Sequence, residues 1–164
     1  MRSVAVLLYG TVWCALVCFV AAESGRRAAT PGRVPATWTS SISAAGLALL
    51  LLHIALVFHV RYDWNHGAAV RQTAQQTAEV FGLDWGGGVY VNYLFATVWA
   101  VDSWWWHINP SASAARAAAL RWALRAFYFV IIVNAAVIFV PGPRRWLGVV
   151  LTMWLLWTWR ARRT

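Results

Sequence analysis

Long apolar runs separated by short polar connections dominate the hydrophobic pattern along the chain. Five such runs can be delimited, at residues 4–22, 42–60, 87–106, 123–140 and 146–159. Most of them approach the roughly 20 apolar residues with which an α-helix crosses the hydrocarbon core of a bilayer. The pattern therefore predicts an all-α fold: a polytopic helical membrane protein, one integral domain over residues 1–164 with four or five transmembrane helices.

The first and last runs each allow a second interpretation. Residues 4–22 follow Arg2 and end in small residues before Glu23, which is also typical of a cleaved signal peptide. The arginine cluster just beyond resists translocation, and this favours a retained span. Residues 146–159 reach only about 21 Å as a helix, whereas the hydrocarbon core is about 30 Å thick. They either span the membrane with snorkelling arginines at their ends or lie at the interface.

Residues 61–85 form a polar connection between the second and third runs. Within it, four residues recur at helical spacing: Val70, Ala74, Thr77 and Phe81. Gly82 follows as a stop signal, and the opposite face carries arginine, glutamine and glutamate side chains. The pattern predicts a short amphipathic helix over residues 66–81 that lies at the membrane surface.

Composition and charge narrow the class of protein. Hydrophobic residues make up 61% of the chain and charged residues 12%, whereas soluble domains carry about 25% charged residues. The net charge of +9 comes from 14 basic residues, all of which are arginine. Because these arginines flank the apolar runs, they indicate contact with a lipid bilayer that has anionic headgroups and argue against nucleic-acid binding.

The distribution of the arginines also predicts an orientation. With five spans and the N-terminus outside the cytoplasm, nine arginines lie on the cytoplasmic side: Arg26, Arg27, Arg33, Arg116, Arg121, Arg125, Arg160, Arg162 and Arg163. The positive-inside rule favours this arrangement, which makes the connection 61–85 extracytoplasmic. Arginine without lysine, together with abundant alanine and tryptophan, is typical of a GC-rich bacterial genome. We therefore expect a multi-pass protein of the cytoplasmic (inner) membrane of a bacterium.

Metal-ligating residue types follow the second apolar run at spacings that place them on one helical face: His59, Asp63 and His66. Two further carboxylates are possible additional ligands: Glu79 and Asp84. This set suits a divalent metal, whose bound water would become acidic enough for hydrolysis. Asn65 is a good helix cap and Gly67 a poor helix interior residue, so the chain is also open to turning here and separating His66 from the other two.

A carboxylate inside the third apolar run, Asp102, is costly in lipid. Because Arg125 enters the fourth run at a similar depth, we expect an intramembrane ion pair between the two. Four more polar residues within the runs are expected to bond across helices: His53, Asn92, Thr97 and Asn134. Histidines on different runs lie at different depths, which argues against haem held within one chain.

These observations predict a non-catalytic membrane protein, either an accessory subunit or an envelope protein. It would present the connection 61–85 to a membrane protein partner or to a second copy of the chain. One alternative is a metal-binding membrane protein, such as a hydrolase, that uses His59, Asp63 and His66. Another is a proton-coupled or small-solute transporter that uses Asp102 and His53.

Overall fold

Helices account for the regular structure of residues 2–27 and 38–160, the part of the chain that this computed structural model describes. In chain order the elements are α1 (Arg2–Arg26), α2 (Trp38–Tyr62), α3 (His66–Phe81), α4 (Gly88–Ile108), α5 (Pro110–Ala114), α6 (Ala118–Val133), the π-helix η1 (Asn134–Ile138) and α7 (Arg144–Trp159). The predicted all-α class is thereby confirmed. Three of the arginines used to predict the orientation lie outside the described residues: Arg33, Arg162 and Arg163.

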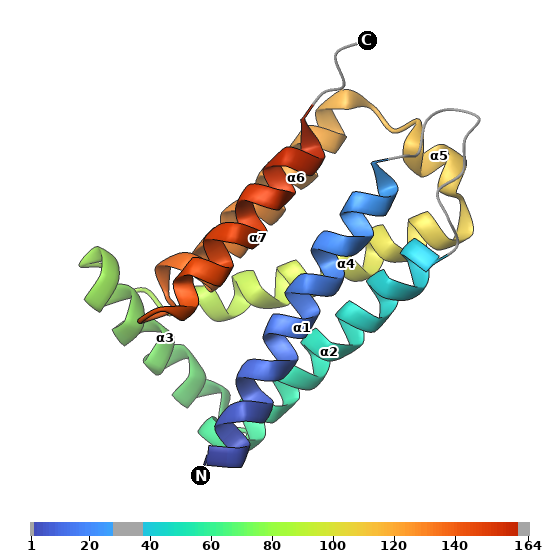
Figure 1. Ribbon diagram of the computed structural model, residues 1–164. Coiled ribbons are helices and arrows are strands. Elements are labelled where there is room, and N and C mark those ends of the chain that lie inside the picture. The colour runs from blue at the N-terminus through green and yellow to red at the C-terminus, as the bar shows by residue number, and fades with distance from the viewer. Residues whose placement is uncertain (1, 28–37, 161–164) are drawn as a thin grey trace.

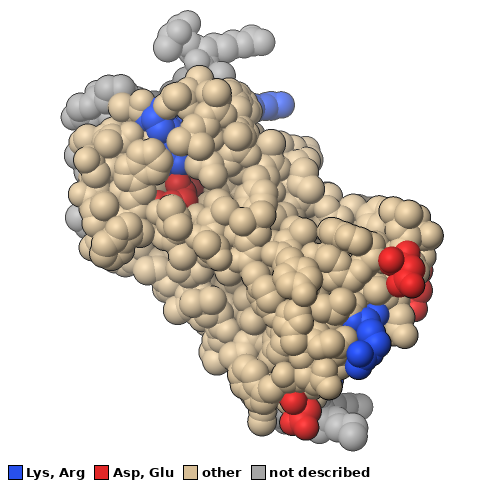
Figure 2. Space-filling view, turned by 180° about the vertical axis from the view of Figure 1, so that it is seen from behind, with Lys and Arg blue, Asp and Glu red and all other residues tan. Residues whose placement is uncertain are grey.

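Within the described residues, three helical stretches are long and apolar enough to cross a membrane: Val6–Arg26, Trp38–Tyr62 and Ala118–Ile138. On the face seen in Figure 2, charged side chains gather at the two ends of the molecule, and a broad band between them carries none. This distribution is the one that a bilayer requires, because charges at the level of the hydrocarbon core are costly. The three apolar helices and the distribution of charge indicate a membrane protein.

Two antiparallel helix pairs and an oblique helix between them make up the arrangement in space. In Figure 1, α1 lies beside α2 and α6 beside α7, while α4 crosses behind α1. The short helix α3 packs against α2 and α4 at one end of the molecule, and α5 follows α4 at the other. The two ends consequently differ in the side chains that they bring together.

A group of aromatic rings forms the centre of the core. The Phe19 ring of α1 meets Trp99 of α4 and Tyr128 of α6 edge-on, with centroids 5.0 and 4.9 Å away. Phe95 lies 5.7 Å from Trp99, and the Trp99 indole donates a hydrogen bond to Ser43 Oγ of α2 at 3.0 Å. These contacts fix the four helices α1, α2, α4 and α6 against one another.

The helix predicted over residues 66–81 is confirmed by α3. Its boundaries follow from local chemistry, because Asn65 Oδ1 accepts a hydrogen bond from the Ala68 amide at 3.0 Å. Gly82 ends the helix in the left-handed region, with φ of 72°. Before it, α2 stops at Tyr62 and the chain reverses through Asp63 and Trp64, both with positive φ.

The approach of α7 to the π-helix depends on a glycine. A Cβ atom at Gly148 would collide with the carbonyl oxygen of Ala136 in η1. Both residues are buried, so backbone would have to move to admit a side chain. Gly148 therefore sets the spacing of α7 from η1.

We predict that Gly148→Ala lowers the melting temperature in detergent, with a loss of about 1 to 3 kcal/mol, the usual size of an overpacking defect. Gly10→Ala is the matched control, since a Cβ atom at that helical position meets nothing within 4 Å. Thermal unfolding followed by circular dichroism measures both variants. Equal melting temperatures for the two would contradict the proposed close approach.

Candidate functional site

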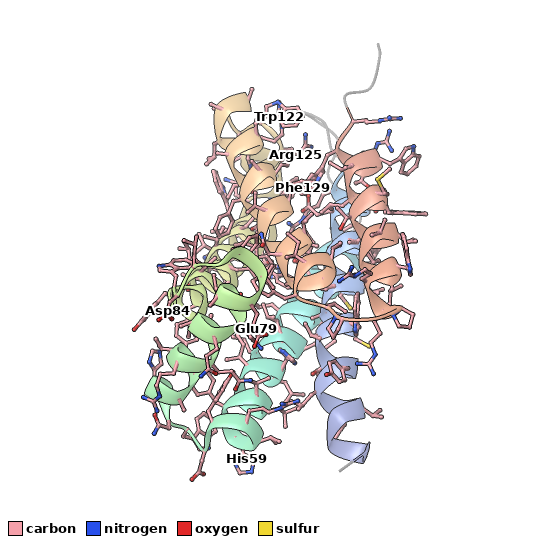
Figure 3. All side chains as sticks on the ribbon, turned by 90° about the vertical axis from the view of Figure 1, so that its left-hand side faces the viewer. His59, Glu79, Asp84, Trp122, Arg125 and Phe129 are labelled. Carbon is pink, nitrogen blue, oxygen red and sulfur yellow. The ribbon has the colours of Figure 1, made fainter. Side chains whose placement is uncertain are left out.

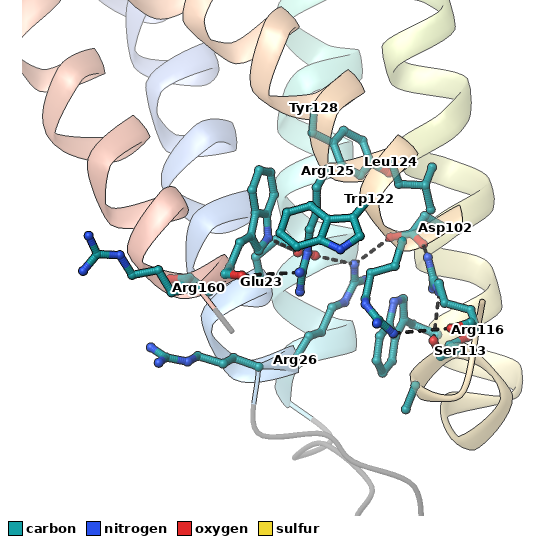
Figure 4. Close-up of a pocket in the computed structure, with 16 residues that line it drawn as sticks. Glu23, Arg26, Asp102, Ser113, Arg116, Trp122, Leu124, Arg125, Tyr128 and Arg160 are labelled. Atoms are coloured by element: carbon teal, nitrogen blue, oxygen red, sulfur yellow. Dashed lines mark hydrogen bonds and ion pairs between the residues drawn. The ribbon is translucent and has the colours of Figure 1, made fainter. Parts of the chain in front are cut away.

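The carboxylate of Asp102 forms ion pairs with two arginine side chains. Its Oδ2 accepts a hydrogen bond from Arg26 Nη1 at 2.8 Å, and its Oδ1 accepts one from Arg116 Nη1 at 2.6 Å (Figure 4). All three side chains are almost fully buried, with 5 to 6% of their surface exposed. Two guanidinium groups thus neutralise one buried carboxylate.

The network continues into two further helices. Arg26 Nη1 also donates to Glu23 Oε1 at 3.0 Å, and Glu23 Oε2 accepts from the Trp159 indole of α7 at 2.8 Å. On the other side, Arg26 Nη2 donates to Ser43 Oγ of α2 at 3.2 Å, and Ser43 bonds Ser103 at 2.7 Å. Arg26 therefore joins α1 to α2 and α4, and Glu23 joins it to α7.

Aromatic rings hold the two central arginines in place. The guanidinium carbons of Arg26 and Arg116 lie 5.1 and 5.5 Å from the centre of the Trp106 ring. Arg116 also lies 4.8 Å from Trp105. Such cation–π contacts strengthen when water is excluded. Two rings of the tryptophan triplet, Trp105 and Trp106, thus orient the arginines of the ion cluster.

The backbone around Asn109 brings Arg116 back toward α4. Asn109 Oδ1 accepts from the Ala112 amide at 3.0 Å and caps α5, with Pro110 in its first turn. After this short helix, Arg116 Nε donates to the Ser113 carbonyl at 2.8 Å. A capped turn between two helices is therefore what places the second arginine beside Asp102.

A cavity of about 340 Å³ lies beside this network. Its charged lining consists of Arg26, Arg27, Arg116, Arg121, Arg125 and Arg160 together with Glu23 and Asp102 (Figure 4). Six arginines and two acidic residues give this set a formal charge of +4. Because Glu23, Arg26, Asp102 and Arg116 balance one another, the surplus resides on the other four arginines. We call this cavity the basic pocket.

Unused hydrogen-bonding capacity is concentrated in the basic pocket. Among the described residues, the buried side-chain atoms without a hydrogen-bond partner are Arg26 Nε, Arg27 Nε, Ser113 Oγ and Arg116 Nη2. All four residues line the pocket. Three of these atoms can only donate, and the hydroxyl can do either. By contrast, all four carboxylate oxygens of Glu23 and Asp102 already accept from protein donors. The pocket therefore has donors to offer and no free carboxylate.

The structure corrects the predicted partner of Asp102. An ion bridge forms, but it uses Arg26 and Arg116 instead of Arg125. Arg125 lines the same pocket, where its Nη1 donates to the Trp159 carbonyl at 3.4 Å and its guanidinium lies 5.2 Å from the Trp122 ring. The depth of Arg125 along its helix correctly predicted that it lies at the same end of the molecule as Asp102. Depth alone does not determine which arginine side chain reaches the Asp102 carboxylate.

The predicted metal ligands do not come together. Among the described residues, no group of three histidine, cysteine or acidic side chains is placed to hold a metal ion. His59 lies by Trp64, with ring centroids 6.5 Å apart, and His66 lies over Phe58, at 6.2 Å. The reversal of the chain after Tyr62 separates them. Glu79 and Asp84 are exposed and lie away from His59 (Figure 3).

The polar residues within the helices mostly bond to their own helix. The Thr97 hydroxyl donates to the Tyr93 carbonyl at 2.9 Å, and Asn134 Nδ2 donates to the Val130 carbonyl at 2.7 Å. His53 does reach another helix, since its Nδ1 lies 2.9 Å from the Leu8 carbonyl of α1. The expectation of bonds across helices is therefore met by His53 and is wrong for Thr97 and Asn134. Asn92 is exposed at the surface of α4.

Sequence reasoning missed Arg26, Glu23 and Arg116 as site residues. The first apolar run was taken to stop at residue 22, whereas α1 continues to Arg26. The spacing of three between Glu23 and Arg26 was an available signal, because such pairs share a helical face. Ser43 and Trp106 carried no comparable signal, since their roles depend on which helices meet.

Comparison with known protein families, with curated proteins and with solved structures finds no match to this chain. The function is therefore inferred from the residues of the site and their geometry.

We predict that Asp102→Asn lowers the free energy of unfolding by about 3 to 5 kcal/mol, because the buried Arg116 loses its carboxylate partner and Arg26 keeps only Glu23. Arg116→Gln should cost less, since Arg26 still neutralises the carboxylate. The double variant Asp102→Asn with Arg116→Gln should lose less free energy of unfolding than the sum of the two single losses. Unfolding of each purified variant in mixed detergent micelles measures these energies.

Arg125→Gln provides the matched comparison for this cycle. Its guanidinium has no hydrogen bond to Asp102, so its effect should add to that of Asp102→Asn within about 0.5 kcal/mol. Strong coupling of Asp102 to Arg125, with none to Arg116, would show that the pairing described above is wrong.

Proposed function

We propose that the chain is a non-catalytic integral membrane protein whose basic pocket binds the anionic headgroup of a lipid. The observation that carries this proposal is that every unpartnered buried polar side-chain atom of the described residues belongs to a residue that lines one arginine-rich cavity. A phosphate group offers several acceptor oxygens and negative charge, which is the complement of unused N–H donors and surplus arginine.

The surroundings of the pocket suit a headgroup. Trp105, Trp106, Trp122 and Trp159 all contact its arginines. Indole rings favour the level of the headgroups, where one part of the ring meets lipid and the N–H meets a polar partner. The volume of about 340 Å³ is at the small end of ligand cavities, whose usual range is about 300 to 1,000 Å³. It suits a headgroup better than a whole lipid.

The proposal includes a topology with more crossings than the three apolar helices. In it, α4 crosses because its charged residue is neutralised, and α7, with 16 residues, crosses with Arg144, Arg145 and Arg160 at its two ends at the level of the headgroups. The arginine-rich end then faces the cytoplasm by the positive-inside rule. The cytoplasmic membrane of a bacterium remains the proposed location.

The alternatives from the sequence have less support. A metal-dependent hydrolase needs ligands that converge, and His59, Asp63 and His66 do not do so. A proton-coupled transporter that uses Asp102 and His53 needs the two in one pathway, yet they line different cavities. Both oxygens of Asp102 are also engaged by arginine.

We predict that short-chain phosphatidylglycerol binds the detergent-purified protein at least about tenfold more tightly than short-chain phosphatidylcholine, a difference of about 1.4 kcal/mol. The double variant Ser113→Ala with Arg121→Gln should remove most of this preference, because it deletes one free hydroxyl and one surplus charge from the pocket. Native mass spectrometry titrations measure the affinities.

Arg71→Gln is the control, since Arg71 is exposed on α3 and does not line the basic pocket. It removes the same charge and should keep the preference for phosphatidylglycerol. Inorganic phosphate serves as a second probe. If it binds as tightly as the lipid, the ligand is a soluble anion and the lipid assignment fails. Equal affinities for the two lipids would reject the anion site altogether.

A second role, as a partner surface, is proposed for the connection 61–85. Four large apolar side chains stay exposed where α3 ends: Val80, Phe81, Leu83 and Trp85, at 45, 51, 63 and 54%. Exposed acidic residues, Glu79 and Asp84, lie among them. Apolar surface with a charged rim suits contact with a partner protein above the membrane better than insertion between lipid chains.

We predict that a spin label at Leu83→Cys, in nanodiscs that hold this protein alone, is more accessible to a water-soluble nickel relaxant than to oxygen dissolved in lipid. The same label at Leu94→Cys, an exposed position on α4, should show the reverse. Oxygen-dominated relaxation at Leu83→Cys would mean that these side chains are a lipid contact, and the partner role would be abandoned.

A further inference from the structure

A second and larger cavity lies at the other end of the molecule. Its volume is about 730 Å³, and none of its lining residues belongs to the basic pocket. It is open on one side and is lined by the N-terminal half of α1, the C-terminal half of α2, one face of α3, the start of α4, the end of α6 with η1, and the start of α7. Its size falls within the range of about 300 to 1,000 Å³ that is usual for cavities holding small molecules. We call it the amphipathic cavity.

The wall inside the helix bundle is apolar. Leu16, Leu50, Phe95 and Ile132 line it and also belong to the hydrophobic core. His53 interrupts this wall, but its Nδ1 donates to the Leu8 carbonyl at 2.9 Å, so its proton already has an acceptor within the protein. A hydrocarbon chain placed against this wall would leave no strong donor unsatisfied there.

The opposite side of the cavity is polar because α3 turns its hydrophilic face inward. Four of the six residues that α3 contributes are polar, namely Gln72, Thr73, Gln76 and Glu79, and the other two are Ala69 and Val80. In Figure 3, α3 lies in front of the helix bundle. The amphipathic pattern of α3 therefore lines a cavity and does not only face water.

Positive charge is in excess at the polar side. Arg61, Arg144 and Arg145 line the cavity together with a single acidic residue, Glu79, which gives a formal charge of +2. Arg144 lies over the Tyr9 ring at 4.2 Å, and Arg145 donates twice to the Val140 carbonyl at 3.3 Å. The ion pairs seen among the described residues involve none of these three arginines. Their charges remain available to an anion.

The π-helix η1 borders the same cavity through Ala135 and Ile138. A π-turn widens a helix locally, and such turns occur frequently at functional sites. On its far side, η1 is held by the contact between Ala136 and Gly148. The irregular segment is thus fixed against α7 and turned toward the cavity.

We propose that the amphipathic cavity binds a single-chain lipid with an anionic head, such as a long-chain carboxylate. The hydrocarbon chain lies along α1, α2 and α4, and the head meets Arg61 and Arg144 beside the polar face of α3. The anionic head is inferred from charge complementarity, since guanidinium groups bind carboxylate or phosphate oxygens in a bidentate manner. The hydrocarbon chain is inferred from the apolar wall of the cavity. This site is independent of the headgroup site in the basic pocket.

Photolabelling tests the proposal directly. A palmitate that carries a diazirine on its chain is bound to the purified full-length protein and irradiated, and the labelled peptides are identified by mass spectrometry. Labelling should saturate, compete with excess palmitate and fall on cavity-lining segments of α1, α2 and η1. Labelling that neither saturates nor competes, spread over the lipid-facing surface, would overturn the proposal.

Two matched pairs of variants sharpen the result. Val57→Trp fills the cavity and should reduce specific labelling about tenfold, whereas Val60→Trp on the same helix lies outside the lining and should not. If Val57→Trp unfolds at a lower temperature, Ile54→Trp replaces it. Equal labelling of the filled and control variants would reject the cavity as the site.

The second pair tests the head. Arg144→Gln should weaken binding of the palmitate probe and leave binding of its uncharged methyl ester unchanged, while Arg71→Gln on the outside of α3 should affect neither. Equal losses for palmitate and methyl ester would show that charge is not recognised, and the anionic head would be withdrawn. Phosphatidylglycerol binding at the basic pocket is measured in parallel, so that failure of either site is seen separately.

Discussion

A buried carboxylate bound by two arginines is the interaction on which the rest of this structure depends. Asp102 lies in a helix that packs among apolar neighbours, where an isolated charge would be strongly destabilising. One arginine would make a neutral pair, but the structure supplies two, from α1 and from the connection after α5. The second leaves a net positive charge, which Glu23 balances through Arg26. The cluster is neutral only when three parts of the chain come together: α1, α4 and the connection after α5.

The same contacts that hold the helices also create the basic pocket. Guanidinium groups fixed by Asp102 and by the Trp106 ring cannot turn away to water, so their remaining N–H groups stay in place without partners. Rigid donors of this kind bind an acceptor with little loss of side-chain entropy. Stability and ligand binding are therefore coupled at this end of the molecule. We expect that replacing a charged residue of the ion cluster by an uncharged one changes both.

Local signals in the sequence were sufficient wherever neighbours along the chain decide the structure. The boundaries of α3 followed from Asn65 and Gly82, because a cap and a left-handed stop act within one turn. The membrane class followed from the apolar runs. The partners of Asp102 did not follow, because Arg26 is 76 residues away and reaches it only through the packing of α1 on α2 and α4. The basic pocket and the amphipathic cavity were missed for the same reason, since each is made by side chains from several helices.

The ion cluster also accounts for the difference between α4 and the three strongly apolar helices. Asp102, Asn92 and the tryptophan triplet lower the hydropathy of α4, which is not among the described helices that are apolar enough to cross a membrane by composition alone. A lone carboxylate near the centre of a membrane helix costs about 2.5 to 3.5 kcal/mol on insertion scales. Once α1 and the segment after α5 supply arginines, that charge is neutralised and its oxygens are all hydrogen-bonded. The burial of Asp102 in α4 therefore depends on residues of the chain before and after that helix, and the carboxylate is neutralised only in the assembled bundle.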